Sequence, residues 1–204
     1  MAVQQVDPVR DRILREATRL FAAQGYAATP IQEVAASAGV TKPTLVYHFT
    51  SKEGLRDAVL TGVLAHWQAE LPRLLAAATG KGPRLDALLD ALFGFFRAEP
   101  ALARLVLREM LDRPDDMGAR LRRELQPWTT LLAQAVRMGQ GGGLLRADAD
   151  PEAFLVLVIS AAIGVVAIGD HAGALVSPEP TVGAQTRELT RIARTALLAP
   201  KEGK

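Results

Sequence analysis

The sequence predicts an all-helical protein of about nine helices, and three observations lead to this prediction. Apolar residues recur at spacings of three and four rather than two, as they do along one face of a helix. Alanine and leucine abound, while aromatic residues make up only 5% of the chain. No segment alternates apolar and polar residues as a half-buried strand does. With 204 residues, 49% of them apolar, the chain can fold as one medium-sized domain or as two small ones sharing a core.

The composition excludes several classes of protein. The chain has no cysteine, which rules out disulfides, thiol nucleophiles and cysteine-ligated metal centres and fits a cytoplasmic location. Residues 1–15 contain no apolar run and predict neither a secretory nor an acylation signal. The formal net charge is only +2, and seven Lys and Arg face six Asp and Glu between Met1 and Leu60. Charge alone therefore does not indicate a nucleic-acid partner.

The first two predicted helices are short and sharply bounded. The first spans 8–24, and Gly25 is placed to end it with a left-handed residue. Thr29 is predicted to cap the second helix, with Gln32 completing a capping box. Gly39 then stops this helix after about two turns. A third helix follows at once, so the pair predicts a helix-turn-helix.

The third helix is predicted to carry the groups that contact DNA. Thr41 is its expected cap, Pro43 stands in its first turn, and Leu45 and Phe49 are expected to face the core. The residues expected to point outward are Lys42, Thr44, Tyr47 and His48.

The rest of the chain predicts one long connecting helix followed by a bundle. Ser51 is expected to cap a fourth helix, assigned to 52–76, in which Gly62 is a weak point for bending. Beyond the linker at 80–83, amphipathic segments are predicted at 85–98, 101–111, 116–138, 151–171 and 182–198.

The stretch 25–54, GYAATPIQEVAASAGVTKPTLVYHFTSKEG, resembles the DNA-binding domain of the tetracycline-repressor-like (TetR) family of bacterial regulators. The glycine-aromatic end of the first helix, the Ala38-Gly39-Val40 turn, the Tyr47-His48-Phe49 run and Ser51-Lys52-Glu53 occur in family order and spacing. The resemblance covers about residues 10–60. Elsewhere only the number of helices and the phrase LLRADADPE at 144–152 match.

The resemblance implies a head at 1–54 that binds double-stranded DNA and a body at 55–204 for ligand binding and dimerisation. The predicted DNA contacts are Thr29, Thr41, Lys42, Pro43, Thr44, Tyr47, His48 and Lys52. Hydroxyls, cations and flat donors of this kind contact phosphate oxygens and base edges. The alternative is that these polar groups only solvate a small helical bundle. Many family members have a small residue in place of Pro43 and an aromatic one in place of Val46, so no operator sequence can be transferred.

The longest apolar run, 153–169, admits two interpretations. Its seventeen residues reach the lower limit for a membrane span, but acidic residues flank it and no Trp, Tyr, Lys or Arg anchors it. By resemblance, this helix and the last one pair with their copies across a two-fold axis, so that a homodimer, and not a membrane, covers them. The predicted interface residues are Phe154, Val158, Ala161, Ala162, Val165 and Ile192. Two heads related by a two-fold axis imply a palindromic operator.

The central helices are rich in Leu, Phe, Met and Trp. Most of these residues are expected to form a packed core, but the resemblance implies an effector pocket here, and the composition favours a small apolar or aromatic effector. The predicted lining residues are His66, Trp67, Phe93, Phe96, Met110 and Trp128.

An enzyme is not predicted, and neither a cofactor nor a metal is expected. The three histidines are dispersed, and His66 with Glu70 is a single pair one turn apart. The glycines at 139–143 follow a helix and lack the lysine of a phosphate-binding loop. The prediction is a homodimeric repressor that a small apolar effector releases from DNA. The alternative is a helical carrier of hydrophobic ligands that does not recognise an operator.

Overall fold

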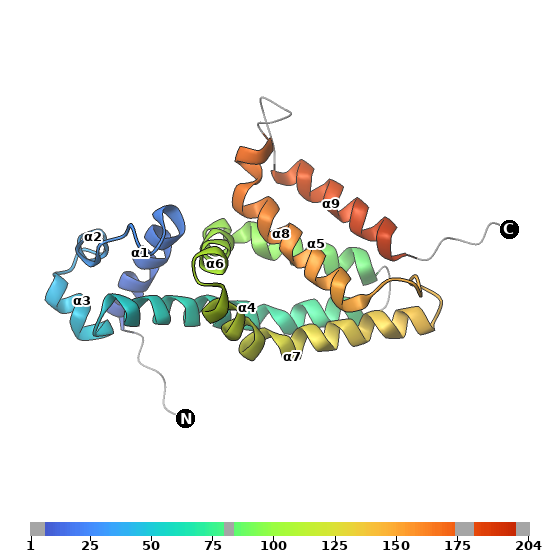
Figure 1. Ribbon diagram of the computed structural model, residues 1–204, viewed down its shortest axis with the longest axis horizontal. Helices are drawn as coiled ribbons and strands as arrows, with labels where there is room; N and C mark the ends of the chain where they lie inside the picture. The colour runs from blue at the N-terminus through green and yellow to red at the C-terminus, as the bar shows by residue number, and fades with distance from the viewer. Residues whose placement is uncertain (1–6, 80–83, 174–181, 199–204) are drawn as a thin grey trace.

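The computed structural model describes residues 7–79, 84–173 and 182–198, which form nine α-helices (Figure 1). The helices are α1 (Pro8–Gln24), α2 (Ile31–Ser37), α3 (Lys42–Phe49), α4 (Lys52–Thr79), α5 (Arg84–Ala98), α6 (Pro100–Asp112), α7 (Pro114–Gly141), α8 (Pro151–Gly173) and α9 (Val182–Leu197). The one extended pairing in the described chain is an antiparallel bridge between Leu145 and Leu198. The all-helical prediction is confirmed. The predicted linker at 80–83 lies outside the described residues.

Local sequence signals explain most helix ends. Asp7 caps α1 because its Oδ1 accepts hydrogen bonds from the backbone N–H groups of Val9 and Arg10 at 3.0 and 3.2 Å. Gly25 ends α1 with φ 87°, as predicted. Ser51 caps α4, since its Oγ accepts from the N–H of Gly54 at 3.0 Å.

The predicted capping box of α2 is wrong. Thr29 is fully buried and its Oγ1 donates to the carbonyl of Gly25 at 2.7 Å, while Pro30 occupies the cap position without a side-chain hydrogen bond. The Thr29 hydroxyl therefore closes the turn after α1 and does not cap the start of α2. Because this hydroxyl is buried and already paired, the prediction that Thr29 contacts DNA is wrong as well. Pairing within the preceding turn satisfies a buried hydroxyl without bringing it to the surface.

The helices form a head and a body joined by α4 and sharing one core. Figure 1 shows α1–α3 at one end and α4 running from them along one edge of the body beside α7, with α8 and α9 packed together at the other edge. Helix α6 lies between α1 and α8. Buried side chains of the head, including Ile13, Phe21 and Leu45, belong to the same apolar cluster as Leu105 and Ala162 of the body. The head thus docks on the body through continuous packing.

Candidate nucleic-acid interface

A tight turn sets the angle between α2 and α3. Gly39 adopts φ 63°, and the N–H of Val40 reaches back to the carbonyl of Ala35 at 2.9 Å. Thr41 then caps α3, its Oγ1 accepting from the N–H of Thr44 at 3.3 Å. This is the helix-turn-helix arrangement that the sequence predicts.

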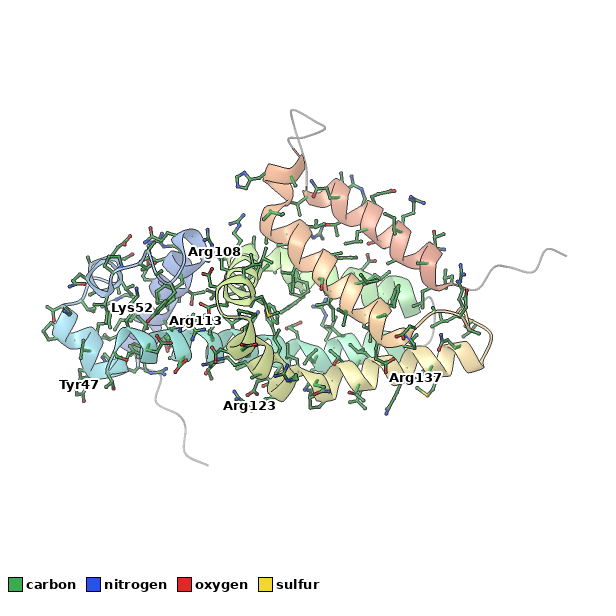
Figure 2. The ribbon with its side chains drawn as sticks, viewed as in Figure 1. Tyr47, Lys52, Arg108, Arg113, Arg123 and Arg137 are labelled. Carbon is green, nitrogen blue, oxygen red and sulfur yellow. The ribbon has the colours of Figure 1, made fainter. Side chains whose placement is uncertain are left out.

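Helix α3 has one buried face and one free face. Leu45 and Phe49 are 0% and 5% exposed, whereas Lys42, Pro43 and Tyr47 are exposed. The Tyr47 side chain is 84% exposed, and Figure 2 shows it at the outer end of the head, away from the body. Since Leu45 and Phe49 fix the rotation of α3, its free face is presented rigidly.

His48, predicted to point outward, is instead largely covered. Its side chain is 14% exposed, and its Nδ1 lies 3.4 Å from Oδ2 of Asp7 at the start of α1. A residue three positions after Leu45 lies only about 60° away from it around the helix, on the flank of the buried face. Its outward placement was therefore a wrong prediction.

Lys52 lies beside the loop between α1 and α2. Its Nζ is 4.3 Å from the ring centroid of Tyr26 and 3.4 Å from the carbonyl oxygen of Ala27. The ring and the carbonyl hold the charge at the side of the head. Thr44 is half-buried and Thr41 is exposed, with their hydroxyl oxygens 2.9 Å apart.

The backbone between α3 and α4 is conformationally constrained. Thr50 has φ 63°, a region that β-branched residues rarely adopt, and its N–H donates to the carbonyl of Val46 at 2.7 Å. A Cβ added to Gly54 would collide with the carbonyl oxygen of Phe49. Close backbone approach at Gly54 therefore fixes the direction of α3 relative to α4.

Several cations of the head are engaged within the protein. Arg12 Nε donates to the carbonyl of Ala38 at 2.6 Å, and Arg19 pairs with Glu16 at 3.0 Å. Arg56, at the start of the connector α4, is only 2% exposed. DNA contacts therefore depend on where the remaining cations lie, because their number is small.

The head meets the body at a buried charge cluster centred on Arg56 of α4. Its Nε donates to Oε2 of Glu109 on α6 at 2.9 Å, and its Nη2 contacts both Glu109 and Oδ2 of Asp116 on α7, the latter at 2.9 Å. Glu109 is 3% exposed. Two buried opposite charges hydrogen-bonded in this way fix the position of α4 relative to α6 and α7.

Tyr26 and Glu53 extend this cluster into the head. The hydroxyl of Tyr26 donates to Oε2 of Glu53 at 2.6 Å, and Arg113 Nη1 donates to Oε1 of Glu53 at 2.7 Å. The guanidinium of Arg113 also lies 4.7 Å from the Tyr26 ring centroid. The hydrogen bond from Tyr26, followed by that from Arg113, lowers the pKa of Glu53, while burial raises the pKa of Tyr26.

Arg108 of α6 makes a second tie to α1. Its Nε and Nη2 donate to the carbonyls of Ala22 and Ala23 at 3.1 and 3.0 Å. Cations near a helix C-terminus satisfy carbonyls that lack partners within the helix. Figure 2 places Arg108 and Arg113 along the region where head and body meet.

This junction was not predicted from the sequence. One signal was present: Glu109 continues the apolar stripe of α6 formed by Leu102, Leu105 and Val106, at a spacing that points a carboxylate into the core. No comparable signal marks Arg56, since an arginine in the first turns of α4 is equally compatible with an exposed position.

The six residues predicted to line an effector pocket are only partly brought together. Trp67 and Phe96 pack edge to face with centroids 5.3 Å apart, and both are buried, as is Phe93. His66 is half-exposed and stacks on Phe95 with centroids 5.6 Å apart. Met110 is 37% exposed. Trp128 is half-buried on α7, and no ring contact ties it to the aromatic cluster in the described chain.

Two residues predicted for the dimer interface lie inside the protomer. Val158 and Ala162 of α8 are 6% and 0% exposed and belong to the shared core, so their placement at an interface was wrong. Phe154, Ala161 and Val165 are half-buried, and Ile192 of α9 is 50% exposed. The large exposed apolar side chains of α8 are Val156, Leu157 and Ile168. The apolar run contained too little polarity to show which side faces inward.

Helix α8 is also the one described helix that is long and apolar enough to cross a membrane, over Pro151–Gly169. One third of this window is buried within the protein, where α8 packs against α5, α6, α7 and α9. The core helix of a soluble protein has the same length and composition, so this similarity is weak support for a membrane span.

Comparison with known proteins gives consistent matches. Residues 13–59 match the family model of bacterial regulatory proteins of the tetR family, and residues 83–196 match that of a tetracyclin repressor-like C-terminal domain. The chain is 34% identical over 137 residues to the HTH-type transcriptional regulator TcmR of Streptomyces glaucescens, covering 56% of this chain and 57% of TcmR. It is 28% identical over 135 residues to the HTH-type transcriptional repressor KstR2 of Mycolicibacterium smegmatis, covering 64% and 66%.

The matched part spans between about half and two thirds of the length of these two curated relatives. Among solved structures, the ketosteroid transcriptional regulator KstR2 of Mycobacterium tuberculosis superposes with a TM-score of 0.71 at 21% identity, covering 96% of this chain and 98% of that one. This similarity establishes a common fold.

Proposed function

This chain belongs to the tetR family of bacterial regulatory proteins, and from that premise we propose that it is a cytoplasmic, homodimeric repressor of transcription. The family consists of transcriptional regulators and not of enzymes. In this proposal residues 1–54 bind a palindromic operator, α4 is the connector, and residues 55–204 bind a small apolar or aromatic effector and dimerise.

The free face of α3 is the observation that carries the proposal. Tyr47 is 84% exposed beside the exposed Lys42 and Pro43. A large ring at the surface of a short, firmly packed helix has no role in the core of the protein. A phenol hydroxyl and an ammonium on that face can contact base edges and phosphates when α3 enters the major groove.

Dimerisation through α8 and α9 would place two such heads on one side of a duplex. The exposed Val156, Leu157 and Ile168 supply an apolar surface on α8, which exposed Ile192 continues on α9. Heads related by a two-fold axis contact half-sites about one helical turn apart, which is the reason for expecting a palindrome.

Effector release would act through α4. This helix carries Trp67 in the aromatic cluster of the body and Arg56 in the charge cluster at the head. An effector that favours a different packing around Trp67 would therefore change the tilt of α4 and the separation of the two heads.

The test is selection of bound duplexes from a random pool at physiological salt, with wild type and Tyr47→Ala in parallel. We expect the wild type to enrich a palindrome and the variant to bind it about 10-fold or more weakly, equivalent to ~1–3 kcal/mol for a base-edge contact. Tyr47→Phe is the matched control that keeps the ring and removes the hydroxyl. If no sequence is enriched while the protein remains a folded dimer, the repressor proposal is wrong and the carrier of hydrophobic ligands takes its place.

A further inference from the structure

A groove of about 300 Å³ lies where α1, the middle of α4 and the start of α6 meet. Of the six residues predicted to line an effector pocket, only His66 borders it. We propose that this groove is a ligand site of its own, and that it takes a small apolar molecule bearing a carboxylate.

The floor of the groove is the surface of the shared core. Val59, Val63 and Leu102 line it and are 2%, 4% and 8% exposed, and half-buried Leu14 adds a further apolar wall from α1. A volume of 300 Å³ is at the lower end of the range for small-molecule sites. An aromatic ring system or a short aliphatic chain has the size and polarity to cover this floor.

Gly62 keeps the groove open. A Cβ built on this residue meets no atom within 4 Å, and Gly62 itself lines the groove. A glycine inside a helix destabilises it by ~0.5–1 kcal/mol relative to alanine. Here the missing side chain leaves space above the apolar floor, in the middle of the connector helix.

The charges around the groove favour an anion. Arg15 and Arg19 of α1 face it, against one carboxylate, that of Glu99. Oε1 of Glu99 lies 3.7 Å from Nε2 of His66, and Arg19 pairs with Glu16. The side chain of Arg15 is exposed and forms no hydrogen bond or ion pair in the described part of the chain; its charge interacts with the neighbouring Glu16 carboxylate only at longer range. Its guanidinium is therefore available for a carboxylate.

A ligand in this position would touch the head through α1, the connector through α4 and the body through α6 at the same time. It would stabilise whichever head orientation gives the best fit to the groove. This regulatory consequence rests on the proposed function, whereas binding itself does not.

The experiment is calorimetric titration of the full chain with 2-naphthoate and with 2-naphthalenemethanol, a neutral analogue. We expect wild type to bind 2-naphthoate at one molecule per protomer. Gly62→Leu should weaken this binding at least 10-fold, because the new side chain fills the groove. The matched control is Gly94→Leu on α5, where an added Cβ also meets no atom within 4 Å but which lies outside the groove lining. The dissociation constant of Gly94→Leu for 2-naphthoate should lie within twofold of that of wild type.

Arg15→Gln tests the charge. It should weaken the binding of 2-naphthoate at least fivefold and leave the binding of the neutral analogue unchanged. Absence of saturable heat with wild type, or equal affinities of Gly62→Leu and Gly94→Leu, overturns the site. An equal loss of affinity for both compounds in Arg15→Gln overturns the preference of the groove for a carboxylate. Duplex selection on the same preparation separates the two proposals: an enriched operator without naphthoate binding rejects only the groove, and naphthoate binding without an operator rejects only the repressor.

Discussion

Two regions of the molecule reverse the usual distribution of side chains, in which charged residues are exposed and apolar residues are buried. One is the junction between head and body, and the other is the outer face of α8. At the junction, Arg56 and Glu109 are 2% and 3% exposed. On α8, Val156 and Leu157 are 63% and 69% exposed. Charge lies inside one region and apolar surface lies outside the other.

The two regions differ because their partners differ. Arg56 has its partners within the same chain, so burial of its charge is compensated by hydrogen bonds that fix the head in one position. The apolar face of α8 has no such cover in one protomer, as expected of a surface whose partner is a second copy. Buried charge thus marks a contact within the chain, and exposed apolar surface marks a proposed contact between chains.

Breaking the junction should give the largest effect. Arg56→Met leaves Glu109 buried without its partner, which should lower the free energy of unfolding by ~3–5 kcal/mol, measured by urea denaturation. The double variant Arg56→Met with Glu109→Met removes both charges and should recover most of this loss. A single variant as stable as wild type would contradict the importance of the pair.

Charging the outer face should act on assembly and leave the protomer intact. Leu157→Glu places a carboxylate in the proposed dimer interface and should raise the dimer dissociation constant at least ~30-fold, about 2 kcal/mol, measured by sedimentation. Leu111→Glu on α6 is the control, since Leu111 is 74% exposed and lies outside α8 and α9. Identical sedimentation of the two variants would remove α8 from the interface.

Acid should distinguish the two regions. The hydrogen bond from Tyr26 lowers the pKa of Glu53 below its usual 4.5, and the one from Arg56 lowers that of Asp116 below 3.8. A carboxyl group whose pKa is lowered by folding stabilises the folded state fully at pH values above its usual pKa. That contribution decreases below the usual pKa and is lost as the pH falls through the lowered pKa of the folded state. Stability should therefore decline below about pH 4.5, and less steeply in the double variant without Arg56. Residues 153–168 of α8 contain no ionisable side chain, so the dimer dissociation constant should change less with acid than the free energy of unfolding does. A larger change in dimer dissociation would refute the assignment of the charged junction and the apolar interface to these two regions.

The smallest effect is expected at the connector between the two regions. Gly62→Ala should stabilise α4 by ~0.5–1 kcal/mol, because alanine loses less backbone entropy and the new Cβ meets open space. Gly94→Ala, with equally open space, should stabilise α5 by a similar amount in thermal unfolding. A loss of stability at Gly62 alone would show that α4 requires its glycine for backbone freedom.

Much of the fold could be predicted because its signals are local. Gly25, Thr41 and Ser51 act on backbone groups within a few residues, and they end or begin helices where the sequence indicates. Thr29 shows the limit of such signals: its hydroxyl had two partners within reach, and burial decided between them.

The candidate site was less predictable because exposure depends on contacts that are distant in sequence. The prediction placed His48 outward, but Asp7, 41 positions earlier, lies beside it. Val158 and Ala162 were assigned to the dimer face, but the rotation of α8 against the body buries them. Tyr47 stays exposed, as predicted, since it lies opposite the two side chains that anchor α3.

The helices, their order, the helix-turn-helix and the family follow from the sequence alone, because periodicity, caps and turns act over a few residues. Three features depend on the packing of the whole chain: Arg56 meets Glu109 across 53 positions, Gly62 opens onto a groove, and Val156 and Leu157, and not Val158, face outward. These outcomes depend on how helices rotate and pack against one another. A single helix with charged or apolar residues on several sides is compatible with more than one rotation, and the neighbouring helices select among them.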